Sequence, residues 1–362
     1  IKFRSCKFCS QLIQNQSYGS LLINKYEHYA FSKSKYPAIM EFEISNKCNL
    51  SCIMCDSNLS SSIELEKTDN SSGNQFYSKK FIEELKEFIP HLQLAEFTGG
   101  DPFLIEEYYQ IWDLINKINT KCHILITTNA NTMNPRIEKM LETHKNIHFN
   151  VSIDSLEKEN YERIRKGGNL EFALQNLDKF IDYTKKHKTN LNILVCPMTV
   201  NKNELYKFVN FANEKDICVF YHTVVKPKEL SLKYTNKTEL QQTIVQMEQY
   251  IFPKSTKNQR TNAQNFQNLI LLLKNWQKET VVSNDEQEKI LSEAESNDII
   301  IKKIANHKYL ESKLLVLLNM IEAQDRSKMI LNKLANTNNE IFIEYLESKD
   351  IDELTNICLN FK

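Results

Sequence analysis

Short apolar runs alternate with longer segments of mixed polarity over residues 38–225. The runs have the length of buried strands, whereas the segments between them place apolar residues three and four positions apart, as Phe81, Leu85 and Phe88 do. One of the helices is expected to start with Asn134 as its cap and Pro135 in its first turn. The predicted strands cover residues 39–44, 92–97, 123–127, 148–153, 191–196 and 219–224, and the predicted helices cover residues 78–89, 105–118, 135–144, 170–186 and 203–213.

This alternation of strand and helix predicts an α/β fold, in which a parallel sheet is connected by right-handed crossovers. Six repeats suit either an open doubly wound sheet or a partial (β/α)6 barrel. In both folds, function is expected at the carboxyl ends of the strands. Small and polar residues of uncommon type follow those ends: three clustered cysteines, the segments 99–102 and 127–129, and Ser152 with Asp154.

The strand pattern stops near Lys237, and the remainder of the chain has the pattern of helices only. We therefore divide the chain into an N-terminal segment of residues 1–36, a (β/α)6 core of residues 37–232 and an all-helical C-terminal appendage of residues 233–362. Within the core, the polar segment 59–75 is expected to be a mobile excursion. The apolar stripes of the appendage are interpreted as its own core rather than as a groove for a partner, and they lie at residues 269–273 with Trp276, 314–321 and 341–346.

The chain carries 46 Lys and Arg against 46 Asp and Glu, so its formal net charge is zero. This balance argues against a surface built for nucleic acid or anionic lipid, and neither a nucleic-acid partner nor a membrane is expected. No uncharged apolar run approaches the ~20 residues of a membrane helix, and no apolar signal region follows the first residues. The chain begins without Met, so we expect further residues before Ile1.

Nine cysteines occur, five of them in the first 55 residues. Because no export signal is visible, we expect a cytoplasmic protein, in which clustered thiolates bind metal and scattered ones are buried. Cys122, Cys196 and Cys218 lie in apolar strands and are interpreted as buried thiols.

The three cysteines Cys48, Cys52 and Cys55 have the spacing CxxxCxxC, so a short loop can wrap three thiolates around one inorganic centre. Three ligands are one short of the four in a closed zinc site or in a fully cysteine-ligated iron–sulfur cluster. A reactive centre keeps such a position open for substrate or cosubstrate. The alternative is a structural zinc site that takes its fourth ligand from elsewhere, for example His28 or His222.

This arrangement resembles the radical S-adenosylmethionine (radical SAM) superfamily. The resemblance covers residues 37–232 and rests on several motifs in the family's order. Thr98-Gly99-Gly100-Asp101-Pro102 is similar to the family's Gly-Gly-Glu-Pro motif, Thr127-Thr128-Asn129 is similar to its Thr-Asn-Gly turn, and residues 151–155 with residues 161–168 are similar to its strand-4 ribose region.

The resemblance implies that Cys48, Cys52 and Cys55 hold a [4Fe-4S] cluster whose fourth iron binds S-adenosylmethionine. One electron from the cluster would then release a 5′-deoxyadenosyl radical that abstracts hydrogen from a substrate, with the cofactors supplying the chemistry. The implied S-adenosylmethionine contacts are Thr98, Gly99, Gly100 and Asp101 at the amino group, Met54 at the adenine, Thr128 and Ser152 at the ribose, and Arg165 at the carboxylate. Asn129 is a further cofactor-binding candidate with no particular contact assigned.

Two of these positions depart from the family pattern. Asp101 replaces the usual Glu, and Met54 stands where an aromatic residue is common. A polarizable apolar side chain such as that of Met can still pack against an adenine.

The flanks of the core resemble the twitch/SPASM-type members of the superfamily, which implies a peptide or protein substrate. Cys6 and Cys9 form a CxxC that resembles the end of a cysteine-rich module, and they are candidates for an auxiliary cluster. Residues 224–231 resemble the exit segment of the twitch-type members. An electron donor such as flavodoxin or ferredoxin is implied as a partner. The alternative is a non-catalytic zinc- or cluster-bearing binding protein whose helical tail engages a partner.

Overall fold

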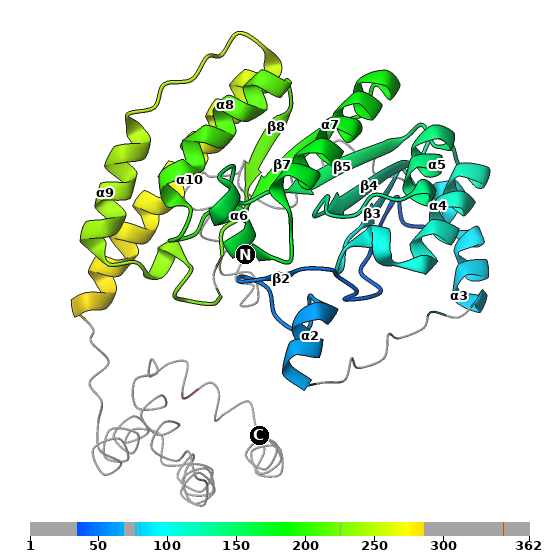
Figure 1. The fold of residues 1–362 in the computed structure, drawn as a ribbon, viewed down its shortest axis with the longest axis horizontal. Helices are drawn as coiled ribbons and strands as arrows, with labels where there is room; N and C mark the ends of the chain where they lie inside the picture. The colour runs from blue at the N-terminus through cyan, green and yellow to red at the C-terminus, as the bar shows by residue number, and fades with distance from the viewer. Residues whose placement is uncertain (1–34, 69–76, 78, 225, 286–342, 344–362) are drawn as a thin grey trace, which may run out of the picture. The chain divides into compact units, whose positions relative to one another are not determined.

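The computed structural model describes residues 35–68, 77, 79–224, 226–285 and 343 of the chain. Six parallel strands form one sheet in the order β1-β3-β4-β5-β7-β8 (Figure 1). Neighbouring strands in this sheet are therefore also consecutive along the chain, apart from β2 and β6, which form a separate sheet. The strands are β1 (Ile39–Phe42), β3 (Leu94–Phe97), β4 (His123–Thr128), β5 (Ile147–Ser152), β7 (Leu191–Val195) and β8 (Cys218–Tyr221). All six agree with the predicted strands to within four residues at either end, and the α/β class with a six-stranded parallel sheet is confirmed.

Helices connect the strands, and α4, α5, α7 and α8 lie along the outer side of the sheet (Figure 1). Within α4, Tyr108, Ile111, Trp112 and Ile115 are buried, which is the three- and four-residue spacing that the sequence displays. The α-helices are α2 (Ser61–Thr68), α3 (Lys79–Glu84), α4 (Glu106–Ile118), α5 (Pro135–Thr143), α6 (Lys158–Ile164), α7 (Leu170–His187), α8 (Leu205–Lys215), α9 (Lys237–Glu248) and α10 (Lys257–Asp285). The short 3-10 helices are η4 (Leu85–Glu87), η5 (Ile89–His91), η6 (Pro102–Leu104), η7 (Lys202–Glu204) and η8 (Leu232–Tyr234).

Local sequence sets the start of α5 as expected. The Asn134 side chain accepts hydrogen bonds from the amides of Arg136 and Ile137, and Pro135 occupies the first turn, where no amide hydrogen is needed. The helix predicted at residues 78–89 instead divides into α3, η4 and η5. Pro90 lies in η5, where its missing amide hydrogen prevents the α-helix from continuing.

Two elements were not predicted from the sequence. The segment 59–75, expected to be a mobile excursion, contains the helix α2. A second, two-stranded antiparallel sheet joins β2 (Ser51–Cys52) to β6 (Arg165–Lys166). A two-residue strand leaves no periodicity in a sequence, because its pairing comes only from the approach of distant residues.

Helix α10 covers the open edge of the sheet. The Asn262 side chain accepts a hydrogen bond from the Val219 amide (2.9 Å) and donates to the Ile217 carbonyl oxygen (2.9 Å), and Asn265 donates to the Val219 carbonyl oxygen (2.8 Å). An edge strand exposes unpaired amide and carbonyl groups, and these side chains pair them. Of the predicted stripe of residues 269–273 with Trp276, Leu269, Ile270, Leu273 and Trp276 pack into the core of the sheet, not into a separate core, because α10 lies along β8, whereas Leu271 is exposed.

The boundary between the two compact units of the chain falls after Gln277, so α9 and most of α10 belong to the unit that contains the sheet. The helical region predicted to begin at residue 233 thus starts inside that unit. No helix in the described ranges combines the length and hydropathy needed to cross a membrane. Several predicted features lie outside the described residues: the segment 1–34 with Cys6, Cys9 and His28, the stripe at residues 314–321, the stripe at residues 341–346 apart from residue 343, and Cys358.

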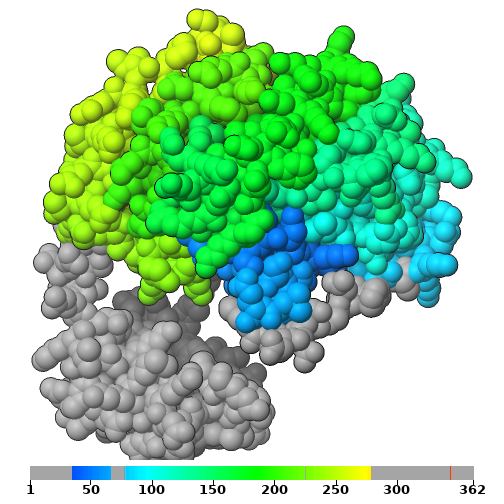
Figure 2. All heavy atoms as spheres, in the orientation of Figure 1, coloured from blue at the N-terminus to red at the C-terminus, as the bar shows by residue number. Residues whose placement is uncertain are grey.

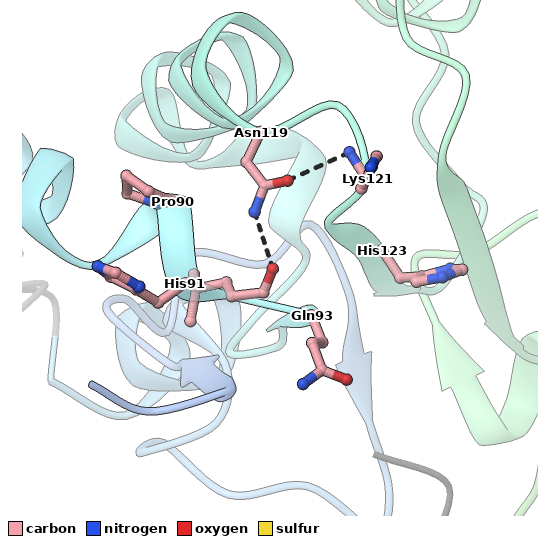
Figure 3. A pocket seen from close by; sticks show the side chains of 7 residues that line it. Pro90, His91, Gln93, Asn119, Lys121 and His123 are labelled. Atoms are coloured by element: carbon pink, nitrogen blue, oxygen red, sulfur yellow. Dashed lines mark hydrogen bonds between the residues drawn. The ribbon is translucent and has the colours of Figure 1, made fainter. Parts of the chain in front are cut away.

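A hollow of about 430 Å³ lies at the amino ends of the strands, the edge opposite to the predicted site (Figure 3). His91, Gln93, Lys121 and His123 are among its lining residues. Asn119 also lines it, but its side-chain amide donates to the Ile89 and Leu92 carbonyl oxygens and therefore holds the wall together.

Beside this hollow, His148 is held neutral by its surroundings. The Asn190 amide donates to Nδ1 of His148, so the ring carries its single proton on Nε2, which lies 2.6 Å from Nδ1 of His123. Burial, and secondarily the charge of His123, lowers the pKa of His148 to about 4.

We predict that removing the Asn262 amide destabilises the sheet edge. Asn262→Ala leaves the Val219 amide and the Ile217 carbonyl without their buried partner, and should lower the free energy of unfolding by about 2–3 kcal/mol. The matched control is Gln264→Ala on the exposed side of α10, expected within about 0.5 kcal/mol of wild type. Urea unfolding measures both; equal values for the two variants would contradict this account of the edge.

We also predict an acid-sensitive contribution from His148. Its folded pKa lies below the ordinary 6.5, so the unfolded chain binds the proton more readily. The contribution is present above pH 6.5 and is lost as pH falls toward 4, a difference of about 3 kcal/mol when fully developed. Urea unfolding of His148→Gln between pH 7 and about 4 should show a shallower pH dependence than wild type. An unchanged slope would contradict the assignment.

Candidate active site

The cysteine loop follows β1 at the carboxyl ends of the strands. Cys52 lies on β2 and pairs with Arg165 on β6, and the amide of Cys55 donates to the Cys52 carbonyl oxygen (3.0 Å) in a tight turn. The amide of Cys48 donates to the Ser61 hydroxyl (3.1 Å), at the first residue of α2. In Figure 2 the residues of this loop and α2, in blue, lie between the green segments after β5 and the cyan segments around α3 and α4. The helix α2 therefore helps to hold the cysteine loop.

The three thiols are largely shielded from solvent, and Cys52 is buried. Burial raises the pKa of the Cys48 thiol. A hydrogen bond between Cys52 and Cys55, followed by burial, raises the pKa of Cys52, and the same hydrogen bond lowers the pKa of Cys55. A bound metal centre would have to displace these protons, since thiolates are the ligands.

The glycine pair after β3 lets two loops approach closely. Gly99 and Gly100 have backbone φ angles of +83° and +47°, which residues other than glycine rarely adopt. A Cβ atom would lie 2.6 Å from the Ser45 carbonyl oxygen at Gly99 and 2.1 Å from the Lys47 carbonyl oxygen at Gly100. The glycines are therefore required by the passage of the cysteine loop directly over them.

Asp101 does not point toward the open side of the site. Its side chain is fully buried and accepts hydrogen bonds from the Thr128 hydroxyl (2.8 Å), the Asn129 amide (2.8 Å) and the Phe103 amide (3.1 Å). Its own amide donates to the Lys47 carbonyl oxygen (2.8 Å). Burial raises the pKa of Asp101, and the three donated hydrogen bonds oppose that rise. Asp101 therefore joins three loops: its carboxylate joins the loops after β3 and β4, and its amide joins them to the loop after β1.

Two side chains bring N–H groups to the cysteine sulfurs. Asn129 Nδ2 lies 3.8 Å from Cys48 Sγ, and Arg165 Nη1 lies 4.0 Å from Cys52 Sγ. Arg165 is itself buried and forms an ion pair with Asp154, with 2.7 Å between Nη2 and Oδ2. The structure thus brings Asn129 and Arg165, both predicted site residues, to the cysteine loop.

The other predicted site residues lie on the same edge. Met54 belongs to a small apolar cluster with Met198, Val224 and Cys196 beyond the ends of β7 and β8. Ser152 ends β5 and is half-buried. Thr98 follows β3, and its carbonyl oxygen lies 2.8 Å from the Tyr108 hydroxyl. No described contact joins Met54 or Ser152 to the cysteine sulfurs.

Sequence reasoning missed the asparagines that flank this site. Asn49 and Asn131 connect the cysteine loop to the turn after β4, because Asn49 Nδ2 donates to the Asn131 carbonyl oxygen (3.1 Å). Ala130, between Asn129 and Asn131, has a φ of +56°. A positive φ is uncommon for a residue other than glycine, and the two asparagines on either side of Ala130 were the signal available in the sequence.

Among the described residues, no three His, Cys, Asp or Glu side chains lie close enough to hold one metal ion.

Gly100→Ala should disrupt the cysteine loop far more than Gly167→Ala. Both glycines have positive φ, which costs alanine about 1–2 kcal/mol. At Gly167 the nearest atom, the Asn49 carbonyl oxygen, leaves 3.4 Å for a Cβ, but at Gly100 the backbone itself must move. We expect a loss of about 1–2 kcal/mol for Gly167→Ala and at least about 3 kcal/mol for Gly100→Ala, measured by urea unfolding. Equal losses would show that the close approach at Gly100 has no structural role.

Comparison with known proteins identifies the core. The model of the family described as the Radical SAM superfamily matches residues 42–212. The GTP 3′,8-cyclase of Clostridium perfringens (strain 13 / Type A) is 25% identical over 190 residues, which are 51% of this chain and 55% of that protein. The probable GTP 3′,8-cyclase of Methanocaldococcus jannaschii is 25% identical over 177 residues, 48% of this chain and 55% of that protein. The chain therefore spans about half the length of the curated relatives it matches.

Among solved structures, Streptococcus suis SuiB bound to S-adenosylmethionine is similar with a TM-score of 0.42 and 16% identity, over 67% of this chain and 50% of that one. Members of the matched family use a [4Fe-4S] cluster and S-adenosylmethionine. The matched residues begin at the last residue of β1 and include the cysteine loop, the glycine pair and the strands through β7. Residues 42–212 therefore form a domain of the radical SAM superfamily.

Proposed function

We propose that Cys48, Cys52 and Cys55 hold the [4Fe-4S] cluster and that this enzyme uses it to cleave S-adenosylmethionine. The observation that carries the proposal is that N–H groups of Asn129 and Arg165 lie 3.8 Å and 4.0 Å from the sulfurs of Cys48 and Cys52, in the loop that carries all three cysteines. Three thiolates with nearby donors are a suitable ligand set for an iron–sulfur cluster. When bound, the cluster and S-adenosylmethionine supply a 5′-deoxyadenosyl radical for hydrogen abstraction.

The residues of this chain bind and orient the cofactors. We assign the backbone at Thr98, Gly99 and Gly100 to the amino group of S-adenosylmethionine, because these glycines have no side chain between that backbone and the cysteine loop. Met54 is assigned to the adenine, supported by its place in the apolar cluster beyond β7 and β8.

The polar assignments differ in how far the structure supports them. Ser152, half-buried at the end of β5, is assigned to the ribose. The Thr128 hydroxyl already donates to Asp101, so it can only accept from the ribose. Arg165 is assigned to the carboxylate, and its Nε is buried without a partner within the described part of the chain. Asp101 acts as a positioning residue and leaves the amino-group contact to the backbone.

For the substrate we propose a peptide or protein. The support is the sequence resemblance of the core's flanks to twitch/SPASM-type members, in particular residues 224–231. Of that segment, Glu229 and Leu230 accept hydrogen bonds from Thr199 in the loop after β7, and Ser231 bridges to Met198. The segment therefore passes beside the carboxyl end of β7, where a substrate has to approach. A nucleotide such as GTP is the second candidate, because the curated relatives that match the core are GTP 3′,8-cyclases.

We further propose a reducing, cytoplasmic setting in which a flavodoxin or ferredoxin supplies the electron. The cysteines of the described residues are all free, which agrees with such a compartment. In this proposal the core of residues 37–232 carries the radical chemistry. The segment 1–36 and the region of residues 233–362 precede and follow it in the sequence and contribute to substrate selection.

The test is anaerobic reconstitution with iron and sulfide, then reduction and addition of S-adenosylmethionine. We expect about four irons per chain and release of 5′-deoxyadenosine. Both should be lost when Cys48, Cys52 and Cys55 are all replaced by Ala, whereas the control Cys122→Ala with Cys218→Ala should retain both. Iron that survives the triple replacement would place a second cluster elsewhere, with Cys6 and Cys9 as its candidates. A chain that binds only zinc, or never cleaves S-adenosylmethionine, would overturn the proposal.

The substrate class is tested by adding candidates to the loaded enzyme. Peptides encoded near this chain's gene and GTP are supplied separately, and products are identified by mass spectrometry. A modified peptide supports the proposal, and a product formed from GTP replaces it with the second candidate.

A further inference from the structure

We infer that Asn129 is a positioning residue that raises the reduction potential of the cluster by donating a hydrogen bond to the sulfur of Cys48. Nδ2 of Asn129 lies 3.8 Å from Cys48 Sγ, within the range for an N–H group bonded to sulfur. The inference deepens the proposed function and rests on it, since it requires that Cys48 be a cluster ligand.

The orientation of the Asn129 amide is fixed by its neighbours. The amide of Asn131 donates to Oδ1 of Asn129 (2.7 Å), and a backbone amide can only donate. The oxygen and the nitrogen of Asn129 therefore cannot exchange places. One hydrogen of Nδ2 goes to Oδ1 of Asn49 (2.9 Å), and the second is left for Cys48.

The backbone of Asn129 is fixed as firmly as its side chain. Its amide donates to the buried carboxylate of Asp101 (2.8 Å). Asn49, the neighbour of Cys48 in the loop, donates to the Asn131 carbonyl oxygen (3.1 Å). Because both the turn and the loop are tied in this way, the donor faces the sulfur without having to reorganise when the cluster is reduced.

An N–H donor at a ligand sulfur stabilises the more negative, reduced form of a cluster, and so raises its potential. Arg165 also lies beside a ligand sulfur, but its charge is balanced by Asp154 and the ion pair is buried. Removing Arg165 would change both charge and folding. Asn129 is neutral, so its replacement tests the hydrogen bond without changing the charge of the site.

The experiment measures the midpoint potential of the reconstituted cluster without S-adenosylmethionine, by spectroscopic redox titration, together with iron content. In Asn129→Ala we expect full iron content and a lower potential. At the wild-type midpoint the ratio of reduced to oxidised cluster should fall about tenfold, equivalent to a shift of about 59 mV for one electron. The matched control is Asn192→Ala, which removes an amide bonded to Asn150 on the sheet and should leave the potential unchanged.

The outcomes separate the inference from the proposed function. A wild-type chain that loads a cluster, with Asn129→Ala at the same potential, overturns the inference and leaves the function intact. If Asn129→Ala binds no iron, the midpoint potential is measured in Asn129→Leu instead. Leucine is closer to asparagine in volume and also lacks the N–H donor, so a lower potential supports the inference and an unchanged potential overturns it. Loss of iron in both variants overturns a role in setting the potential. A wild-type chain without a cluster overturns the function and the inference together.

Discussion

The site depends on the hydrogen bonds of one buried residue, Asp101. Its carboxylate accepts three hydrogen bonds from the loops after β3 and β4, and its backbone amide donates to the cysteine loop after β1. A buried carboxylate is costly unless its oxygens are satisfied, and here all the donors come from segments that surround the site. The hydrogen bonds of Asp101 therefore hold three loops in place, and these loops carry Asn129 and the glycine pair.

The cysteine loop is built from short contacts that no regular element could supply. Gly99 and Gly100 let the backbone of residues 45–47 pass directly over them, and the β2–β6 pair places Cys52 beside Arg165. Serine hydroxyls at the start of α2 hold Cys48 from the other side. The loop is thus fixed from three directions, which suits a centre whose ligands must keep their spacing.

The repeat of strands and helices could be read from the sequence because each element buries one face. In α4, the spacing of Tyr108, Ile111, Trp112 and Ile115 requires a helix, and the apolar runs between helices require buried strands. The place of the site at the carboxyl ends then follows from the fold itself. The cysteine cluster and the glycine pair were visible because they stand together in the sequence at those ends, and the remaining site residues were named from the resemblance of their motifs to a known family.

The sequence by itself determined the alternation of strands and helices, the helical faces and the edge of the sheet where the chemistry lies, since these depend on periodicity and chain order. The order of the strands in the sheet came only from the tertiary structure. Tertiary structure alone decided that Asp101 turns inward, that Asn129 faces Cys48, and that Asn262 on α10 pairs the edge of β8. Those contacts join residues far apart in the chain through single hydrogen bonds. Such bonds leave no periodic trace in a sequence, and their direction is set only when the loops have met.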